Sequence, residues 1–427
     1  MTYIHECPEW PHFRWDMASL ALPLAELRHR QGLLVGRMNA MGFSARAEAG
    51  LETLALDMVK SGAIEGESLN MPQVRSSLAR RLGVDIGGLS PVSRQVEGLT
   101  EMMLDATQRY AEPLTEERLL RWHLALFSGG APRRVVPGAW RTAASGPMQV
   151  VSGYIGHEKV HFEAPAAERL EREISRFLEW FNAPPVSDPV LGAGIAHLWF
   201  VTIHPFEDGN GRIARAIADC ALARADGCPQ RFYSMSGQIE RERRTYYEIL
   251  ERTQKGDLEI TPWLEWFLAC LRRAVDGAET TLAAVFRKAS VWNRANRHAL
   301  NARQRAILNR LLDGFEGRLT SGKYAKLAKC SQDTALRDIR ELMEFGILRQ
   351  GKEGGRSTGY ELSGEGDASY SPVVSTVLGT IEKDESGRGV GMNDLAMNVS
   401  PSIGIAIIGS LLGSNALAGS SITGATG

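Results

Sequence analysis

The sequence predicts a mainly α-helical protein with a helical N-terminal domain, a larger helical core that carries one β-hairpin, and a small C-terminal unit of helices and a hairpin. Apolar residues recur with helical spacing over most of the chain. Only two short stretches, 150–162 and 347–362, combine β-branched or aromatic residues with central glycines, as hairpins do. The length of 427 residues exceeds that of one compact domain.

Residues 1–95 are expected to form the N-terminal helical domain. From Leu51 to Gly62, apolar positions follow the i, i+3, i+4, i+7 spacing of a helix with one buried face. The segment Ser61-Gly-Ala-Ile-Glu-Gly66 then ends this helix with glycines.

Residues 96–290 are expected to form the helical core. The hairpin at 150–162 lies between its second and third helices. The expected helices cover about 96–110, 115–127, 165–182, 189–203, 212–225, 240–254 and 261–288.

Residues 302–361 read as a separate unit with the element order of a winged helix-turn-helix. Helices are expected at Ala302–Leu312, Ser321–Lys329 and Ser331–Gly346, followed by two strands around a glycine-rich turn. The unit holds 12 Lys and Arg against 8 Asp and Glu, a formal charge of 12 − 8 = +4.

This charge leaves DNA binding by residues 302–361 open. Arg337 and Arg340 lie on the expected recognition helix, with Lys352 and Arg356 in the wing, where DNA phosphates could be bound. Three acidic residues share that helix and weaken the DNA interpretation: Asp338, Glu341 and Glu344. Winged helices also serve as protein-docking units.

Residues 364–427 are rich in Gly, Ser and Ala and are expected to be a disordered tail. The uncharged stretch Ser402–Gly419 holds too many glycines and serines to make a good membrane span, so no membrane association is expected. The net charge of −1 argues against a general affinity for polyanions. Five scattered cysteines and no secretory signal favour a cytoplasmic location.

The run His204-Pro-Phe-Glu-Asp-Gly-Asn-Gly-Arg-Ile-Ala-Arg215 lies between two apolar helices and carries the chemistry. Gly209 and Gly211 flank Asn210, and such a turn lets backbone N–H groups face an anion at the start of a helix. A di- or triphosphate suits this pocket.

The charged side chains of the run complete a phosphate site. Arg212 and Arg215 are three residues apart and share a helix face, so they could hold different phosphates. Asp208 beside them suits Mg²⁺, which takes one or two carboxylates plus phosphate oxygens and water. His204 can remove a proton from an attacking hydroxyl near neutral pH. Phe206 is expected to face the core.

Each part of this run taken alone has an ordinary structural reading as a turn or a solvated helix face. All the parts within twelve residues favour a functional site. The run resembles the signature of the Fic family, His-x-Phe-x-Asp/Glu-Gly-Asn-Gly-Arg-x-x-Arg, at every defined position. The resemblance implies the helical Fic fold and a nucleotidyltransferase that moves AMP from Mg-ATP to a Ser, Thr or Tyr hydroxyl of a protein.

The same resemblance implies a role for each residue of the run. His204 would be the base, Asp208 the magnesium ligand and Asn210 a phosphate contact. Arg212 would hold the inner phosphates and Arg215 the γ-phosphate.

Two neighbouring segments resemble further parts of the family. The hairpin at 150–162 resembles the flap that aligns the target by strand addition, with the flap residues Val151, Gly153, Tyr154 and Ile155. Residues 238–247 resemble the helix that flanks the nucleotide base, with Tyr246 and Tyr247 near the adenine. A tyrosine pair on such a helix could equally belong to the core.

Ser61-Gly-Ala-Ile-Glu-Gly66 resembles the inhibitory motif Ser/Thr-x-x-x-Glu-Gly/Asn of Fic proteins, here placed ahead of the active-site motif. Glu65 would pair with Arg215 and occupy the charge that should receive the γ-phosphate. In some relatives the equivalent glutamate supports removal of AMP, and the sequence does not decide between the two directions.

The N-terminal residues, with Trp10, Trp15 and the stretch 33–42, resemble an uncharacterised domain often found ahead of bacterial Fic cores. The whole resemblance covers roughly residues 3–362. It implies ATP and a target protein as partners. Many relatives pair through the Fic core, and the sequence leaves the oligomeric state of this chain open. Alternatives are another nucleotide or phosphocholine donor, or a DNA-binding regulator whose core senses nucleotide. A sensor would have no use for the base His204.

Overall fold

The computed structural model describes residues 2–41, 43–86, 89–152, 159–185, 187–312, 315, 318–351 and 359–363. It contains two compact units. Unit 1 comprises Met1–Leu34 and Arg46–Leu282, and unit 2 comprises Val35–Ala45 and Ala283–Gly427. The tail expected at 364–427 and residues 352–358 of the expected hairpin, including Lys352 and Arg356, lie outside the described residues.

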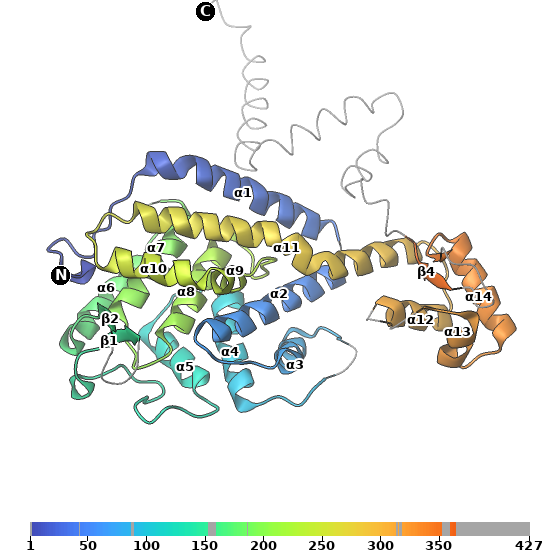
Figure 1. Cartoon of the computed structure of the whole chain (residues 1–427), viewed down its shortest axis with the longest axis horizontal. Coiled ribbons are helices and arrows are strands. Elements are labelled where there is room, and N and C mark those ends of the chain that lie inside the picture. The colour runs from blue at the N-terminus through green and yellow to red at the C-terminus, as the bar shows by residue number, and fades with distance from the viewer. Residues whose placement is uncertain are drawn as a thin grey trace, which may run out of the picture. The chain divides into compact units, whose positions relative to one another are not determined.

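The expectation of a mainly helical fold is confirmed (Figure 1). Short 3-10 turns occur at Ile4–Glu6, Ala143–Ser145 and Ala167–Arg169. The helices of unit 1 and those that span its boundary are α1 (Met17–Asn39), α2 (Phe43–Ile64), α3 (Met71–Leu82), α4 (Arg94–Gln108), α5 (Glu116–Leu126), α6 (Leu170–Asn182), α7 (Pro189–Ile203), α8 (Asn210–Asp226), α9 (Met235–Arg241), α10 (Arg243–Gln254) and α11 (Thr261–Ala295).

Helices α7 and α8 form the centre of unit 1 and are joined by residues 204–209. Every residue of α7 except Pro189 and Gly192 is buried, so this helix is apolar on all sides, as a central core helix must be. Asp188 caps its N-terminus by accepting the Val190 N–H at 2.8 Å. The loop that follows α7 therefore starts from a rigid element.

The N-terminal segment is attached to this centre through Trp10, and α1 is joined to α11 by an ion pair. Trp10 of the N-terminal segment packs against Trp199 of α7 and donates its indole N–H to Glu173 of α6 at 2.8 Å. Helices α1 and α11 lie side by side (Figure 1), and Arg30 pairs with Asp276 at 2.6 Å.

The hairpin expected at 150–162 is present as β1 (Gln149–Ser152) and β2 (Lys159–Glu163). The strands are antiparallel, with Gln149 opposite Glu163 and a register shift between Val150 and Val151. The strand β2 lies against α10, because His161 Nδ1 is 2.6 Å from Glu251 Oε2.

Unit 2 contains α12 (Ala302–Leu312), α13 (Ser321–Ala328), α14 (Gln332–Glu344) and an antiparallel pair, β3 (Leu348–Gln350) and β4 (Tyr360–Leu362). The order of these elements matches the expected one, and the winged helix itself stays a prediction. Asp338 of α14 is buried and accepts hydrogen bonds from Arg303, Asn301 and Tyr324. Arg337 and Arg340 are exposed, and DNA binding stays a prediction as well.

Most helix ends differ from the expected ones by a few residues, and two helices differ more strongly. The helix expected at 240–254 is divided into α9 and α10 at Glu242, whose backbone leaves the helical region at φ −108° and ψ 24°. Arg273 of α11 donates two hydrogen bonds to the Glu242 carboxylate, at 2.5 and 2.6 Å, and holds the break. The helix expected at 261–288 continues to Ala295.

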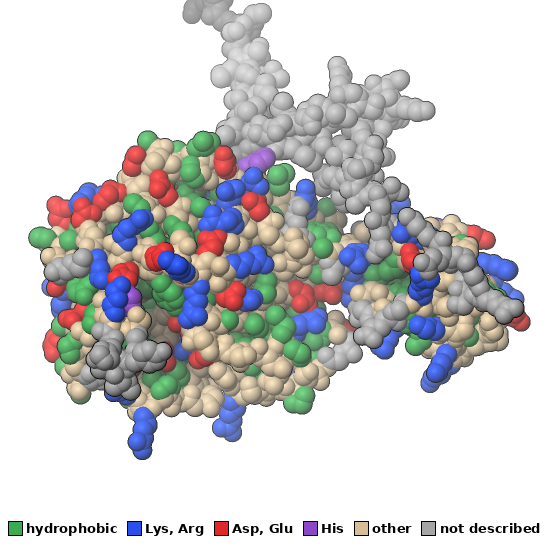
Figure 2. Space-filling view, viewed as in Figure 1, with side chains coloured by type: hydrophobic (Ala, Val, Ile, Leu, Met, Phe, Trp, Pro, Cys, Tyr) green, Lys and Arg blue, Asp and Glu red, His purple; other side chains and the backbone are tan. Residues whose placement is uncertain are grey.

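The surface of unit 1 carries acidic and basic side chains interspersed over the face shown in Figure 2. This agrees with the near-zero net charge. Within the described residues, no helix combines the length and the apolar character that a membrane crossing needs. The five cysteines all lie in described parts of the chain and are free thiols.

Candidate active site

The loop after α7 begins with His204 in a left-handed backbone conformation, at φ 50° and ψ 58°. Such a conformation is unfavourable for a residue with a side chain, so it needs support from elsewhere. Arg141 supplies that support, because its buried guanidinium donates from Nε to His204 O at 2.8 Å and its backbone N–H bonds Pro205 O at 3.0 Å. No motif in the sequence indicates this role of Arg141.

The imidazole of His204 is poised as a proton acceptor. Its Nδ1 lies 3.2 Å from Val201 O, and a carbonyl can only accept, so Nδ1 carries the proton and Nε2 keeps its lone pair. Burial lowers the pKa of His204 to about 4, with Arg141 adding to the effect, while the bond to Val201 and the carboxylates of Glu65 and Asp208 oppose it. The ring is therefore neutral at pH 7.

Two side chains of the loop 205–210 hold it in place: Asn210 binds its backbone, and Phe206 packs into the core. Asn210 uses its whole amide on Phe206, accepting from its N–H at 2.9 Å and donating to its carbonyl at 2.8 Å. A phosphate contact by Asn210 would therefore come from its backbone N–H. The buried ring of Phe206 stacks on His123 at 4.0 Å, as its expected core position requires.

His123 is a second residue that the sequence analysis missed. Its Nδ1 accepts the Gly138 N–H at 2.9 Å, so Nε2 carries the proton and donates to Asp208 O at 3.3 Å. Burial lowers the pKa of His123 to about 4, which keeps this ring neutral as well. The contacts of His123 could not be predicted from the sequence, because both partners are backbone atoms, 15 and 85 residues further along the chain.

The N-terminus of α8 forms an anion cradle. Gly209 adopts φ +86°, and the first hydrogen bond of the helix runs from Ile213 N–H to Gly209 O at 3.0 Å. The amides of residues 210–212 therefore have no partner inside the helix. A Cβ added at Gly211 would lie 2.2 Å from Glu65 Oε1, so the Glu65 carboxylate lies directly over this cradle.

Arg215 is bound by the end of α2. Its Nε donates to Ser61 Oγ at 2.9 Å, and its Nη2 donates to Ser61 O at 3.0 Å and to Glu65 Oε1 at 2.8 Å. Only 3% of this side chain is exposed. Burial alone would raise the pKa of Glu65, but the charge and the hydrogen bond of Arg215, together with the charge of Arg212, lower the net pKa. Glu65 is therefore ionised.

Arg212 lies one turn earlier and has its own carboxylates. Its Nη1 forms an ion pair with Glu67 Oε1, and its Nη2 lies 3.4 Å from Asp208 Oδ1. Its guanidinium also lies over the Phe127 ring, 5.3 Å from the centroid. Glu67 stands outside the inhibitory motif, and the sequence analysis missed it.

Asp208 is the residue best placed to hold a metal ion beside the cradle. Its side chain is 48% exposed, and its Oδ1 accepts the Gly209 N–H at 2.5 Å. No group of three His, Cys, Asp or Glu side chains in the described part of the chain could hold a metal ion. A Mg²⁺ ion at Asp208 would complete its coordination with phosphate oxygens and water, as Mg²⁺ commonly does.

The tyrosine pair divides between core and surface. Tyr246 is buried, with its hydroxyl 2.9 Å from His197 Nε2, whereas Tyr247 is 38% exposed and donates weakly to Ile64 O at 3.5 Å. Of the flap residues, Val151 is exposed on β1. Gly153, Tyr154 and Ile155 lie outside the described residues.

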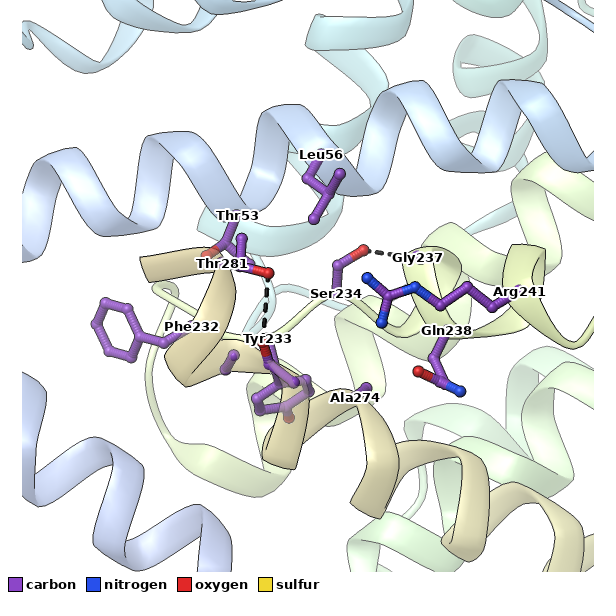
Figure 3. Close-up of a pocket in the computed structure, with 12 residues that line it drawn as sticks. Thr53, Leu56, Phe232, Tyr233, Ser234, Gly237, Gln238, Arg241, Ala274 and Thr281 are labelled. Atoms are coloured by element: carbon purple, nitrogen blue, oxygen red, sulfur yellow. Dashed lines mark hydrogen bonds between the residues drawn. The ribbon is translucent and has the colours of Figure 1, made fainter. Parts of the chain in front are cut away.

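Helix α2 is anchored one turn before Ser61. The buried Asp57 carboxylate accepts from Ser234 Oγ at 2.7 Å, Ser236 N–H at 3.0 Å and Ser236 Oγ at 2.9 Å. Ser234 Oγ in turn accepts the Gly237 N–H at 2.9 Å and caps α9. Of these residues, Ser234 and Gly237 line the small pocket drawn in Figure 3, which α2 lines with Thr53 and Leu56.

The comparisons with known proteins point to the same part of the chain. The Fic/DOC family model matches residues 113–222, and a domain of unknown function (DUF4172) matches residues 3–84. The chain is 28% identical over 229 residues to a protein adenylyltransferase Fic of Nematostella vectensis, covering 52% of this chain and 48% of the relative. A Culex quinquefasciatus protein of the same name is 30% identical over 227 residues, covering 51% and 40%.

The matched region thus spans about half or less of the length of these relatives. The crystal structure of a Fic family protein from Desulfovibrio desulfuricans superposes with a TM-score of 0.50 at 22% identity, covering 81% of this chain and 97% of that one, which supports the fold. The loop geometry, the matched family model and the related fold agree, and the chain therefore carries a domain of the Fic/DOC family.

Proposed function

We propose that this protein transfers AMP from Mg-ATP to a Ser, Thr or Tyr hydroxyl of a target protein, and that Glu65 inhibits the reaction within the same chain. The observation that carries the proposal is the site after α7, where a neutral imidazole with a free Nε2 adjoins a helix N-terminus and two buried arginines. The relatives named protein adenylyltransferase support the same reaction.

Each residue of the site has a separate role in the proposed reaction. His204 Nε2 takes the proton of the target hydroxyl while the hydroxyl oxygen attacks the α-phosphorus of ATP. The bond from the α-phosphorus to the bridging oxygen breaks, and pyrophosphate leaves. The amides of residues 210–212, with Arg212 and Arg215, hold the phosphates in line for this displacement. Mg²⁺ at Asp208 would neutralise charge on the leaving pyrophosphate.

Inhibition follows from the place of the Glu65 carboxylate. It lies over Gly211 and pairs with Arg215, so a γ-phosphate that needs the same amides and the same guanidinium meets a fixed negative charge. ATP that binds beside Glu65 is misplaced, and its α-phosphorus is then not aligned with the hydroxyl.

The test is labelling with ATP that carries radioactive phosphorus at the α-position. We expect Glu65→Gly to raise self-labelling by at least about tenfold, which corresponds to about 1.4 kcal/mol of barrier. Adding His204→Ala to that variant should abolish the labelling while ATP still binds. ATP labelled at the γ-position should give no signal, which separates AMP transfer from phosphoryl transfer.

The matched control is Glu52→Gln on the same helix α2, which removes the ion pair between Glu52 and Arg75 of α3. This variant should label like the wild type. Equal labelling of wild type and Glu65→Gly would refute the inhibitory role. Labelling that survives His204→Ala would refute the assignment of the base.

A further inference from the structure

We propose that Glu67 is a second inhibitory carboxylate, which competes with the nucleotide phosphates for Arg212. The inference rests on the proposed nucleotide transfer and names a further control of the same site. Glu65 and Glu67 are two residues apart, and each binds a different arginine of α8. Both cations of the phosphate site are therefore engaged by one short segment.

The backbone after α2 places both side chains at once. The N–H groups of Glu65 and Glu67 both donate to Gly62 O, each at 3.0 Å. Gly66 between them adopts φ +82°, a left-handed conformation that reverses the chain and that glycine adopts without strain. The two carboxylates therefore enter the site as a pair held by a single turn.

The buried guanidinium of Arg212 is neutralised by the carboxylate of Glu67. The arginine side chain is 3% exposed, and its Nε has no partner among the described residues. Its second carboxylate contact, to Asp208, is the longer one at 3.4 Å. A buried guanidinium without a close anion is strongly unfavourable. A phosphate that binds Arg212 at Nη1 must therefore displace the Glu67 carboxylate.

The two glutamates should act on different steps. Glu65 lies over the amides at Gly211, where it controls the pose of the phosphates and hence kcat. Glu67 lies on the side chain of Arg212, where it competes for a contact that the nucleotide makes in both ground state and transition state. Such an interaction changes affinity rather than the chemical step.

The test measures Mg-ATP affinity by calorimetry in the His204→Ala background, which keeps binding separate from transfer. We expect Glu67→Gln to lower the Kd on the order of tenfold. Glu67→Asp keeps the charge but shortens the side chain, so it should also tighten binding if the ion pair matters. Glu52→Gln, which removes a negative charge elsewhere on α2, should leave the Kd unchanged.

An unchanged or weaker affinity in Glu67→Gln would overturn the inference. So would Glu67→Asp binding like the parent, because a general field effect of the charge would then explain the result. If Glu67→Gln does not fold, as thermal unfolding would show, Glu67→Asp alone decides between the two outcomes.

The outcomes also separate this inference from the proposed function. Without the His204 substitution, the double variant Glu65→Gly with Glu67→Gln should have a lower KM for ATP than Glu65→Gly alone, with kcat within about twofold. If Glu65→Gly transfers no AMP while Glu67→Gln still tightens ATP binding, the proposed reaction fails and the role of Glu67 stands. If Glu65→Gly is active and Glu67→Gln changes nothing, the reverse holds.

Discussion

His204 depends on one residue that is distant in the sequence and on one that lies a single helical turn before it. Its left-handed backbone is held by Arg141, and its ring is oriented by the bond from Nδ1 to Val201 O. These contacts fix the tautomer and leave Nε2 free to accept a proton. The low pKa of about 4 means that the ring is neutral over the whole physiological range.

This pKa predicts how the rate of the reaction falls at low pH. The base works in its neutral form, so the rate falls only when the pH approaches 4 and the ring protonates. In the Glu65→Gly variant the pKa should be lower still, because Glu65 raises it. We expect kcat/KM of that variant to be flat between about pH 8 and pH 5.5. A half-maximal rate near pH 6.5, the ordinary value for histidine, would contradict this expectation.

The residues of the signature could be predicted because their spacing along the chain is itself the signal. Arg141 and His123 could not, since they bind backbone atoms of His204 and Asp208 from 63 and 85 residues away. Any buried polar side chain can bind a carbonyl, so such contacts leave no pattern in one sequence. Glu67 could not be predicted either, because it stands outside the inhibitory motif and its partner Arg212 was already expected to bind phosphate.

At the scale of elements, the start of α8 combines a tight turn with a close approach by α2. Gly211 makes this approach feasible, because no Cβ stands between the helix amides and the Glu65 carboxylate. Glycine was expected here for its exposed amides. The approach of a carboxylate from 146 residues earlier in the chain was expected only through the resemblance to the inhibitory motif.

Gly211→Ala should therefore abolish nucleotide binding in the Glu65→Gly background. The added methyl would fill the place where Glu65 Oε1 now lies. In the proposed reaction a phosphate of ATP takes this place once Glu65 is removed. Folding should be preserved, since alanine favours a helix. Gly192→Ala in α7 is the matched control, because a Cβ there meets nothing within 4 Å. Calorimetry with Mg-ATP checks both variants, and normal binding by Gly211→Ala would exclude the cradle as the phosphate site.

Helix existence was predictable from apolar spacing, whereas helix breaks were not. The division between α9 and α10 at Glu242 is held by Arg273, 31 residues further along the chain. The local sequence 240–254 favours one continuous helix, and the ion pair with Arg273 is a tertiary contact that this sequence does not indicate. The hairpin was predictable because its glycines and β-branched residues interrupt a helical pattern.

On the scale of the whole molecule, unit 1 buries neutral histidines near its centre. His197 is fully surrounded by the core, and burial lowers its pKa to about 3, with Arg215 adding to the effect. The unfolded chain binds a proton at this residue below about pH 6.5, while the folded chain does not. Stability from His197 is therefore present above pH 6.5 and is lost as the pH falls towards 3.

We expect this loss to be measurable against His197→Gln, which keeps a polar group for the Tyr246 hydroxyl but does not titrate. From pH 7 to pH 5 the wild type should lose about 2 kcal/mol more unfolding free energy than the variant. Urea denaturation at both pH values measures the difference. Parallel losses in the two proteins would show that His197 is not the source.

The attachment of Asp57 limits which rearrangements can free the phosphate site. A rigid-body departure of α2 would strip the three hydrogen bonds from a buried carboxylate. Local unfolding of α2 after Ser61 would keep the three hydrogen bonds of Asp57. It would require only that the short segment around Gly66 move away from α8. An activating signal would thus have to reach a handful of residues at one helix terminus. A ligand, a modification or a neighbouring chain that binds this segment would be enough to release the phosphate site.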